Sequence, residues 1–280
     1  MIAHTEEVVS LNDPRLAPYR TLKQQRDHRK GGIFVAEGTK VVRRLLGSSL
    51  TTESVLLSPE RMEEFRSLLQ ARTESVTVFV GSQEMLARIV GFELHQGAMA
   101  IARAPMPLTV DEAVDAAASP RLIVALDNLA HAENVGVVVR NCAACGVHAI
   151  IVGETSADPY LRRAVRNSMG TVFRTPIVHA RHLPDAIRTL RCVHGVQIWA
   201  AHARPGSVSV FDADLRTDCC IVLGNEGDGV GPEVLAQCSG ALAIPMVAGV
   251  DSFNVACASA AILCEVTRQR GLGAVSRVEP

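Results

Sequence analysis

The sequence LIVALDNLAHAENVGVVVRNCAACGVHAIIV, residues 122–152, predicts a strand, a helix and a second strand in succession. Residues 122–126 and 148–152 are short apolar runs of the length expected for buried strands. Between them, from Asn134 to Cys145, apolar residues keep the i, i+3, i+4, i+7 spacing of an amphipathic helix. This alternation indicates an α/β fold whose sheet is covered by helices.

The same alternation continues on both sides of a proline-containing stretch, residues 102–120. We expect the domain junction there, with a first domain over residues 1–106, a linker over 107–119 and a second domain over 120–272. In the first domain a basic helix near residues 18–29 precedes strand-like runs that alternate with helical ones, a pattern typical of a small mixed sheet. The second domain is expected to end in a long helix over residues 254–270.

The composition favours a sizeable core, since 48% of the 280 residues are hydrophobic and 20% are charged. The formal net charge is −1, but the charges are unevenly distributed. Residues 15–44 hold nine Lys and Arg against two acidic residues, an excess of seven positive charges. Such an excess suggests a polyanionic partner for the N-terminal part, although a solvated helix face is the alternative.

Several classes of protein are disfavoured by what the sequence lacks. Cys142 and Cys145 have a zinc-like spacing without a second pair at a suitable distance, so we interpret them as buried small residues, and we expect no metal site. Eight scattered cysteines without a framework suggest reduced thiols and a cytoplasmic location. The sequence shows neither a signal-peptide pattern nor an apolar run of about 20 residues, so we expect no membrane partner.

A glycine loop, Leu223-Gly-Asn-Glu-Gly-Asp-Gly229, follows an apolar strand. Its spacing differs from the dinucleotide fingerprint, and it has no Walker lysine. Glu226 within the loop would repel a phosphate. The loop therefore favours a nucleoside-like ligand without phosphates, a description that S-adenosylmethionine fits.

Polar residues stand at two further places where a strand gives way to a loop or helix, the usual ligand-binding edge of an open α/β sheet. Asn134 and Arg140 follow the first strand, and an arginine there is suited either to a phosphate or ribose or to a surface salt bridge. Ile244-Pro-Met246 ends a later strand and is followed by Ser252 and Asn254. These last two residues can be helix N-caps, ligand contacts, or both.

These motifs together resemble those of the SpoU (TrmH-type) branch of the SPOUT RNA 2′-O-ribose methyltransferases. That family reads N-x-G-x-x-x-R, then G-N/S-E-x-x-G, then I-P-M with S-L-N-V, and this sequence differs only at Phe253, where the family has leucine. The resemblance spans about residues 121–270. Residues 18–22 and 34–38 look like the ribosomal-protein-like substrate-binding domain that often precedes it.

The resemblance implies a SPOUT domain with a trefoil knot, a homodimer, and S-adenosylmethionine-dependent methylation of a ribose 2′-hydroxyl in rRNA or tRNA. It implies a role for Arg140 in engaging the ribose or phosphate and stabilising the developing alkoxide, with other polar residues orienting the reactants. The expected catalytic residues are Arg140, Asn134, Glu226, Ser252 and Asn254. The expected cofactor-binding residues are Ala201, Leu223, Gly224, Gly229, Ile244, Met246, Phe253 and Val255. The expected RNA-binding residues are Arg20, Lys23, Arg26, Arg29, Lys30, Arg163 and Arg166.

Two other functions stay open at this point. One is a non-catalytic RNA-binding protein that keeps the fold, which the intact Arg140, Glu226 and Asn254 disfavour. The other is a nucleotide-dependent oxidoreductase, which the glycine spacing disfavours. The sequence does not identify the RNA or the nucleotide that is modified.

Overall fold

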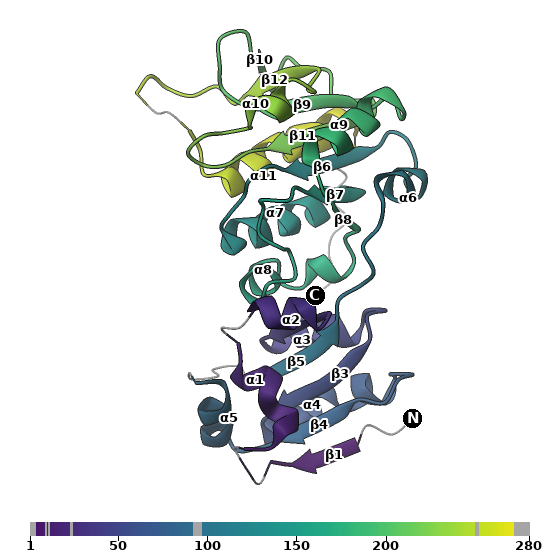
Figure 1. The fold of residues 1–280 in the computed structure, drawn as a ribbon, viewed down its shortest axis with the longest axis vertical. Coiled ribbons are helices and arrows are strands. Elements are labelled where there is room, and N and C mark those ends of the chain that lie inside the picture. The colour runs from purple at the N-terminus through teal and green to yellow at the C-terminus, as the bar shows by residue number, and fades with distance from the viewer. Residues whose placement is uncertain are drawn as a thin grey trace. The chain divides into compact units, whose positions relative to one another are not determined.

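The chain folds into two compact units in the computed structural model, which describes residues 4–8, 10, 12–22, 25–91, 97–249 and 252–271 (Figure 1). The first unit combines residues 1–106 with residues 159–174, and the second combines residues 107–158 with residues 175–280. The segment 159–174 thus packs with the N-terminal unit although it lies inside the C-terminal half of the sequence. The domain boundaries expected from the sequence stay a prediction.

The first unit is built on a mixed five-stranded sheet in the order β1-β4-β3-β5-β2. Strands β1, β4 and β3 run parallel, whereas β5 is antiparallel to both β3 and β2. The mixed sheet predicted from the alternating pattern is therefore present. Its strands are β1 (His4–Glu7), β2 (Ile33–Glu37), β3 (Thr52–Leu57), β4 (Thr77–Val80) and β5 (Ala98–Arg103).

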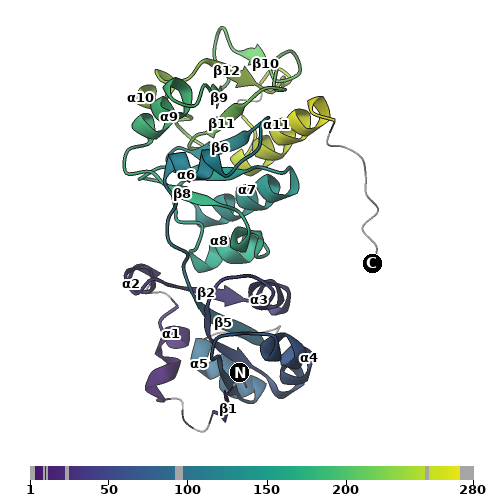
Figure 2. The same ribbon diagram turned by 90° about the vertical axis from the view of Figure 1, so that its right-hand side faces the viewer.

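Helices cover both faces of this sheet, as the second view shows (Figure 2). On one face Leu16, Tyr19 and Leu86 pack into a single apolar cluster with alternate residues of the strands. The opposite face is covered by α3 and α4, whose buried residues include Val42 and Phe65. The helices are η1 (Pro14–Leu16), α1 (Ala17–Arg20), α2 (Gln25–Lys30), α3 (Thr39–Leu46), α4 (Pro59–Gln70) and α5 (Gln83–Val90).

The second unit is built on a fully parallel seven-stranded sheet in the order β10-β12-β9-β11-β6-β7-β8. Its central strands are buried along their whole length, as expected for a parallel sheet with helices on both faces. The strands are β6 (Leu122–Leu126), β7 (Ala149–Val152), β8 (Ile177–His179), β9 (Gln197–Ala201), β10 (Val208–Ser209), β11 (Cys219–Leu223) and β12 (Gly240–Ala243).

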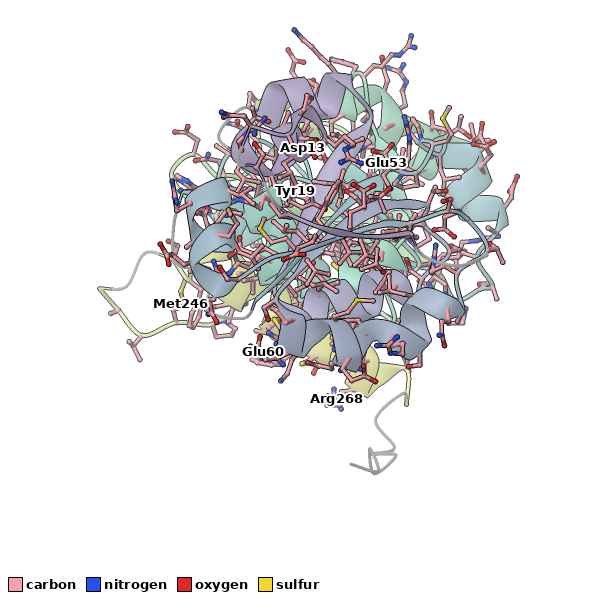
Figure 3. All side chains as sticks on the ribbon, turned by 90° about the horizontal axis from the view of Figure 1, so that it is seen from below. Asp13, Tyr19, Glu53, Glu60, Met246 and Arg268 are labelled. Atoms are coloured by element: carbon pink, nitrogen blue, oxygen red, sulfur yellow. The ribbon has the colours of Figure 1, made fainter. Side chains whose placement is uncertain are left out.

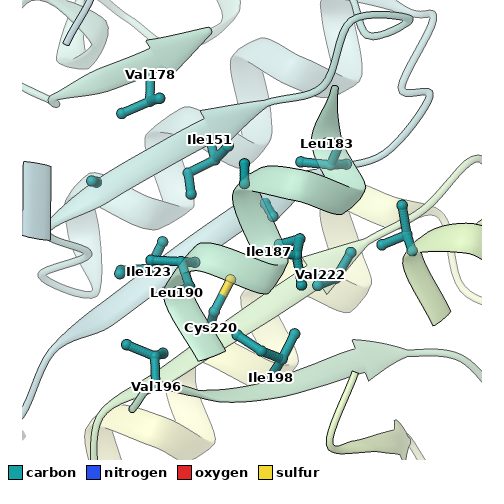
Figure 4. Packing of buried hydrophobic residues seen from close by; sticks show 14 of the residues in the cluster. Ile123, Ile151, Val178, Leu183, Ile187, Leu190, Val196, Ile198, Cys220 and Val222 are labelled. Carbon is teal, nitrogen blue, oxygen red and sulfur yellow. The ribbon is translucent and has the colours of Figure 1, made fainter. Parts of the chain in front are cut away.

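One face of this sheet forms a core with α6, α9 and α10. Figure 4 shows Leu183, Ile187 and Leu190 of α9 directed at alternate strand residues, among them Ile151 and Val222. The opposite face is covered by α7 and α11, which pack against each other. The helices are α6 (Val110–Asp115), α7 (Ala132–Ala144), α9 (Leu183–Cys192), α10 (Pro232–Leu235) and α11 (Val255–Gln269).

The segment 159–174 carries α8 (Arg162–Asn167) and η2 (Thr171–Phe173) and is attached to β2 and α3 of the first unit. The ring of Phe34 lies 5.2 Å from the ring of Tyr160 and 5.5 Å from that of Phe173, measured between centroids. Arg44 donates a hydrogen bond to the carbonyl of Met169. These contacts explain why a short piece of the second half packs with the first unit.

The structure adds detail to two of the segments described from the sequence. The single basic helix expected near residues 18–29 is instead two helices, α1 and α2. Helix α1 ends at Thr21, whose backbone is no longer helical (φ −94°, ψ 30°) and whose N–H and hydroxyl both donate to the carbonyl of Ala17. The expected linker 107–119 contains α6, which begins at a capping box formed by Thr109 and Glu112. Ala113 and Val114 of this helix are buried in the second unit's core.

Candidate active site

A cavity of about 490 Å³ lies at the carboxyl ends of β9, β11 and β12 in the second unit. One wall is apolar and is formed by side chains such as Leu223, Leu242, Ile244 and Ile262. The other wall is made by the glycine loop after β11. Parallel sheets hold their ligands at this edge, so the cavity is the candidate active site of the chain.

The glycine loop is closed on itself by its own backbone. Asn225 and Gly229 exchange two hydrogen bonds, each with an N···O distance of 2.9 Å, and Gly229 has a φ of +72°. A Cβ added at Gly224 would lie 2.2 Å from the carbonyl carbon of Gly229. Only glycine therefore permits the two strands of the loop to approach this closely.

The side chain of Asn225 fastens the loop to the end of β6. Its Oδ1 accepts hydrogen bonds from the N–H groups of Gly227 (2.8 Å) and Asp228 (3.3 Å), while its Nδ2 donates to the carbonyl of Asn128 (3.0 Å). Asn128 has a φ of +56°, in the left-handed region. The loop after β6 is thus held in an uncommon conformation beside the cavity loop.

A second tie between these two loops involves Asp127, which follows β6. Its Oδ2 accepts a hydrogen bond of 2.7 Å from the backbone N–H of Gly231. Burial raises the pKa of Asp127 above its ordinary value, the Gly231 hydrogen bond opposes that rise, and the charge of Glu154 adds to it. The Asp127 side chain does not line the cavity, but its hydrogen bond to Gly231 holds the end of the glycine loop in position.

Three of the sequence-predicted catalytic residues form one hydrogen-bonded chain. The amide nitrogen of Asn134 in α7 donates to the carboxylate of Glu226 in the glycine loop. Asn254 in turn donates its amide to the Oδ1 of Asn134 across 3.3 Å. Asn254 is also the N-cap of α11, accepting a hydrogen bond of 2.9 Å from the N–H of Ala256. The three sequence motifs therefore meet at this chain.

The remaining two predicted catalytic residues lie in different surroundings. Ser252 lines the cavity, with Glu226 and Phe253. Arg140 is exposed on α7, is absent from the cavity lining, and makes no hydrogen bond or ion pair with the residues that the structure describes. The structure of one chain thus leaves Arg140 outside the cavity.

All eight residues expected to bind a cofactor line the cavity: Ala201, Leu223, Gly224, Gly229, Ile244, Met246, Phe253 and Val255. Met246, labelled in Figure 3, follows β12 and is half-buried. Phe253, the departure from the expected motif, has half of its surface exposed while contributing to the lining. Their binding roles stay a prediction.

His202 and Asp228 also line the cavity, and the sequence analysis did not select them. His202 directly follows β9, and a Cβ on Gly229 would lie 2.7 Å from its Nδ1, so the ring packs on the glycine loop. The position of His202 in the sequence could have identified it, because a polar residue immediately after a parallel strand lies at the ligand-binding edge of the sheet.

The expected RNA-binding residues are distributed over three helices of the first unit. Arg20 is exposed at the end of α1, and Arg29 and Lys30 are exposed in the last turn of α2. Lys23 and the side chain of Arg26 lie outside the described part of the chain. The last two expected residues, Arg163 and Arg166, are exposed on α8.

The charges around the cavity restrict its ligand. Glu226 and Asp228 contribute two carboxylates, and the described residues of the lining include neither lysine nor arginine. A phosphate group would meet repulsion there, whereas a ligand with a positive charge and an apolar body would be accommodated. Among the described residues, no three His, Cys, Asp or Glu side chains are grouped to hold a metal ion.

Two family models match parts of the chain. Residues 121–264 match the model of the SpoU rRNA methylase family, and residues 13–100 match the MRM3-like substrate-binding domain. The chain is 31% identical to an uncharacterized tRNA/rRNA methyltransferase of Mycobacterium bovis over 270 residues, which cover 94% of this chain and 92% of the other. It is 29% identical to the 23S rRNA (guanosine-2′-O-)-methyltransferase RlmB of Ralstonia nicotianae, over 76% of this chain and 84% of that protein.

Solved structures with the same fold cover nearly the whole chain. An AdoMet-bound rRNA methyltransferase from Sinorhizobium meliloti superposes with a TM-score of 0.79 at 26% identity, covering 94% of this chain and 98% of the other. The SpoU methyltransferase AviRb from Streptomyces viridochromogenes superposes with a TM-score of 0.81 at 23% identity, covering 93% and 99% respectively, and shares the fold. The α/β architecture predicted from the sequence is confirmed.

Proposed function

This chain belongs to the SpoU rRNA methylase family, and we propose from that membership and from its cavity that it methylates a ribose 2′-hydroxyl of RNA with S-adenosylmethionine. The observation that carries the proposal is the cavity itself. It combines an apolar wall with two carboxylates, and neither lysine nor arginine occurs in its described lining.

The cavity fits S-adenosylmethionine in chemical character. When bound, this cofactor supplies an electrophilic methyl group on a positively charged sulfonium. The apolar wall around Leu223 and Ile244 suits an adenine ring, while the exposed backbone of the glycine loop can hydrogen-bond to its edge. Glu226 and Asp228 favour positive charge in the same space.

Within this scheme Asn134, Glu226 and Asn254 are positioning residues. Because they are joined to one another, the carboxylate of Glu226 is fixed in direction by α7 and by the start of α11. A carboxylate held in this way loses little entropy when the reactants bind, and it can accept a hydrogen bond from a ribose or cofactor hydroxyl. Ser252 adds a hydroxyl to the same cavity.

Arg140 is proposed to act on the RNA side. A guanidinium stays protonated, so it stabilises the oxyanion that develops as the ribose hydroxyl loses its proton, and it can hold the adjacent phosphate. Its exposure on α7 leaves it accessible to a large substrate.

Three further features of the family belong to this proposal. We propose that the chain forms a homodimer, because α7 and α11 leave small residues exposed along one side, among them Ala144, Cys257 and Ala261. We also propose the trefoil knot that the family resemblance implies, in a sheet where β11 lies between β6 and β9. A cytoplasmic location is supported by eight free cysteines. Within the described residues, no helix is long and apolar enough to cross a bilayer.

The decisive experiment is transfer of a labelled methyl group. Purified protein and methyl-labelled S-adenosylmethionine would be incubated with tRNA and rRNA from cells that lack the protein, and with the same RNA from cells that contain it. We expect labelling of one RNA from the first source only, since the second is already modified, and the modified position should resist alkaline cleavage. RNA binding without labelling of any fraction would favour the alternative, a non-catalytic RNA-binding protein.

A further inference from the structure

Two cysteine side chains of the second unit lie together between α7 and α11, outside the candidate active site. Cys145 is the C-cap of α7, and Cys264 lies in the second half of α11. Their thiols are hydrogen-bonding neighbours, although the two residues are more than 100 positions apart in the chain. Neither residue lines the cavity that would hold the cofactor. The proposed reaction therefore gives this pair no role.

The packing of the two helices explains why these residues meet. Asn141 of α7 donates hydrogen bonds from its side chain to two groups of α11, the carbonyl of Ala256 (2.8 Å) and the Oγ of Ser259 (2.9 Å). Cys145 follows Asn141 by one turn and lies on the same side of its helix. Cys264 follows Ser259 toward the end of α11. The thiol pair is thus the next contact along the same helix–helix interface.

The backbone that carries each thiol is fixed. The N–H of Cys145 donates to the carbonyl of Asn141 (3.0 Å), and the N–H of Val147 returns to the carbonyl of Cys142 (2.9 Å). Cys264 lies inside a regular helix, where its carbonyl accepts a hydrogen bond of 2.8 Å from the hydroxyl of Thr267. Two sulfurs that are already neighbours on fixed helices can be joined with little movement of the backbone.

The two thiols differ in exposure, and this difference assigns their roles. The sequence predicts a buried position for Cys145, but in the structure it is half-buried, whereas Cys264 is exposed. Burial, and to a lesser extent the neighbouring sulfur of Cys264, raises the pKa of Cys145 to about 11. Because the thiolate is the reactive form, Cys145 is a weak first nucleophile at neutral pH. Cys264 is therefore the sulfur that a reagent in solvent reaches first.

We propose that Cys145 and Cys264 are an oxidation site, at which a small disulfide compound generates an intrachain disulfide between α7 and α11. In the first step the sulfur of Cys264 attacks one sulfur of the compound, which releases one thiolate and leaves a mixed disulfide on Cys264. In the second step the sulfur of Cys145 attacks the sulfur of Cys264 and releases the other thiolate. The two cysteine protons pass to the two released thiolates. Two cysteine thiols are thus oxidised while one small disulfide is reduced to two thiols.

The disulfide would connect the two helices that carry Asn134 and Asn254 near their starts. It would also close a loop of more than 100 residues, and a cross-link over so long a loop strongly restricts the unfolded chain. In a reducing cytoplasm such a bond is transient and senses redox state. Oxidation should therefore appear as a reversible increase in the stability of the second unit.

The test exposes the folded full-length protein to oxidised glutathione. Remaining thiols would then be alkylated, and unreduced peptides would be mapped by mass spectrometry. We expect one cross-linked pair of peptides that contains Cys145 and Cys264 and has lost two hydrogen atoms. The product should run as a single chain on a non-reducing gel. Its thermal unfolding midpoint should rise by about 5 °C or more, and dithiothreitol should reverse the rise.

Two variants assign the roles of the sulfurs. In Cys145→Ser the glutathione adduct should remain on Cys264, because the second thiol that would displace it is missing. The matched control is Cys257→Ser, which removes another exposed cysteine of α11 and should form the same cross-link as the wild type. Thermal unfolding of the reduced variants shows whether they are folded.

Three results in the wild type would overturn the site: no cross-link, a cross-link between other cysteines, or a covalent dimer formed through Cys257 or Cys264. The oxidation site is independent of the proposed methyltransferase function. Methyl transfer by the reduced protein tests that function separately, so either proposal can fail while the other stands.

Discussion

The side-chain amide of Asn134 donates a hydrogen bond to the carboxylate of Glu226, which lies 92 positions later in the chain. This contact joins α7, which begins after β6, to the glycine loop that follows β11. β6 and β11 are paired neighbours in the sheet, so their carboxyl ends bring the two residues together. Catalysis by positioning depends on such contacts, because a small displacement of a reacting group costs a large part of the rate.

The first prediction removes the charge of Glu226 and keeps its shape. In Glu226→Gln the acceptor oxygen for Asn134 is retained, but the attraction for a positively charged cofactor is lost. Charge-assisted hydrogen bonds are about twice as strong as neutral ones, so we expect cofactor affinity to fall roughly tenfold, and methyl transfer by at least as much. Calorimetry and a labelled-methyl assay would measure the two effects.

The control for this prediction is Glu233→Gln, which removes the same charge from a side chain that is 80% exposed on α10. It should behave as the wild type. Equal cofactor affinity in Glu226→Gln and Glu233→Gln would contradict the role assigned to the carboxylate.

The second prediction concerns Arg140, whose position outside the cavity lining separates catalysis from cofactor binding. Arg140→Ala should reduce methyl transfer by about 10²-fold or more, because a developing oxyanion loses its positive partner. S-adenosylmethionine should bind with unchanged affinity. Arg188→Ala on α9 is the matched control, and full activity in Arg140→Ala would refute the proposed mechanism.

The fold was predictable from the sequence where a single element carries its own signal. The sequence identified the strand at residues 122–126, the helix that follows it and the N-cap at Asn254. These features depend on the spacing of apolar residues and on capping side chains, which are recognised within a short stretch of sequence. Strands β1 and β10 were not identified, since His4–Glu7 and Val208–Ser209 are short and are held by backbone pairing at the sheet edges. Tertiary pairing of this kind leaves no periodic pattern.

The site was predictable to the extent that its residues directly follow strands. Leu223, Gly224 and Ile244 were selected on that ground or by family resemblance, and all of them line the cavity. The link between Asn134 and Glu226 depends on which strands are neighbours, a property that no local pattern contains. The attachment of residues 159–174 to β2 was inaccessible for the same reason, because it depends on Phe34 and Glu37 meeting residues more than 120 positions away.

The third prediction concerns pH and the end of α11. Arg268, which projects from α11 (Figure 3), and Gln269 donate hydrogen bonds to Glu265 and lower its pKa from 4.5 to about 2. A depressed pKa stabilises the folded state above the unfolded pKa, and this stabilisation is lost as the pH falls from about 4.5 toward 2. The free energy of unfolding of Glu265→Gln should therefore be lower than that of the wild type at neutral pH.

We expect that difference to be about 1 kcal/mol, because Arg268 is largely exposed and water screens the pair. It should shrink as the pH approaches about 3, where the wild-type carboxylate begins to lose its advantage. Urea unfolding of both proteins over this pH range is the measurement. A difference that does not change with pH would show that the carboxylate charge contributes nothing.

The fourth prediction concerns Arg270, whose guanidinium donates hydrogen bonds to four backbone carbonyls at the starts of β6 and β11. The acceptors are the carbonyl oxygens of Pro120 (2.7 Å), Arg121 (3.0 Å), Leu215 (3.0 Å) and Thr217 (2.6 Å). An ammonium group cannot reach all four, so Arg270→Lys should lose about 2–3 kcal/mol of unfolding free energy. Arg216→Lys, at an arginine that is 69% exposed, should unfold at nearly the same urea concentration as the wild type. Urea unfolding would compare them, and equal losses would contradict the prediction.

The fifth prediction compares two glycines of one loop. A Cβ at Gly224 would lie 2.2–2.3 Å from backbone atoms of Gly229 and Val230, whereas a Cβ at Gly227 would approach only the side-chain oxygen of Asn225, at 3.4 Å. Gly224→Ala must therefore open the paired loop and displace Glu226, while Gly227→Ala needs no backbone movement.

We expect the affinity for the cofactor to fall by about 10²-fold or more in Gly224→Ala and by less than about threefold in Gly227→Ala. The reason is that a steric clash that only a backbone movement can relieve costs several kcal/mol. Thermal unfolding distinguishes a local effect from a global loss of structure. Because the loop lies beyond the carboxyl end of β11 and outside the core, Gly224→Ala should still unfold cooperatively. Equal cofactor affinity in the two variants would show that the closed loop is not what holds the cofactor.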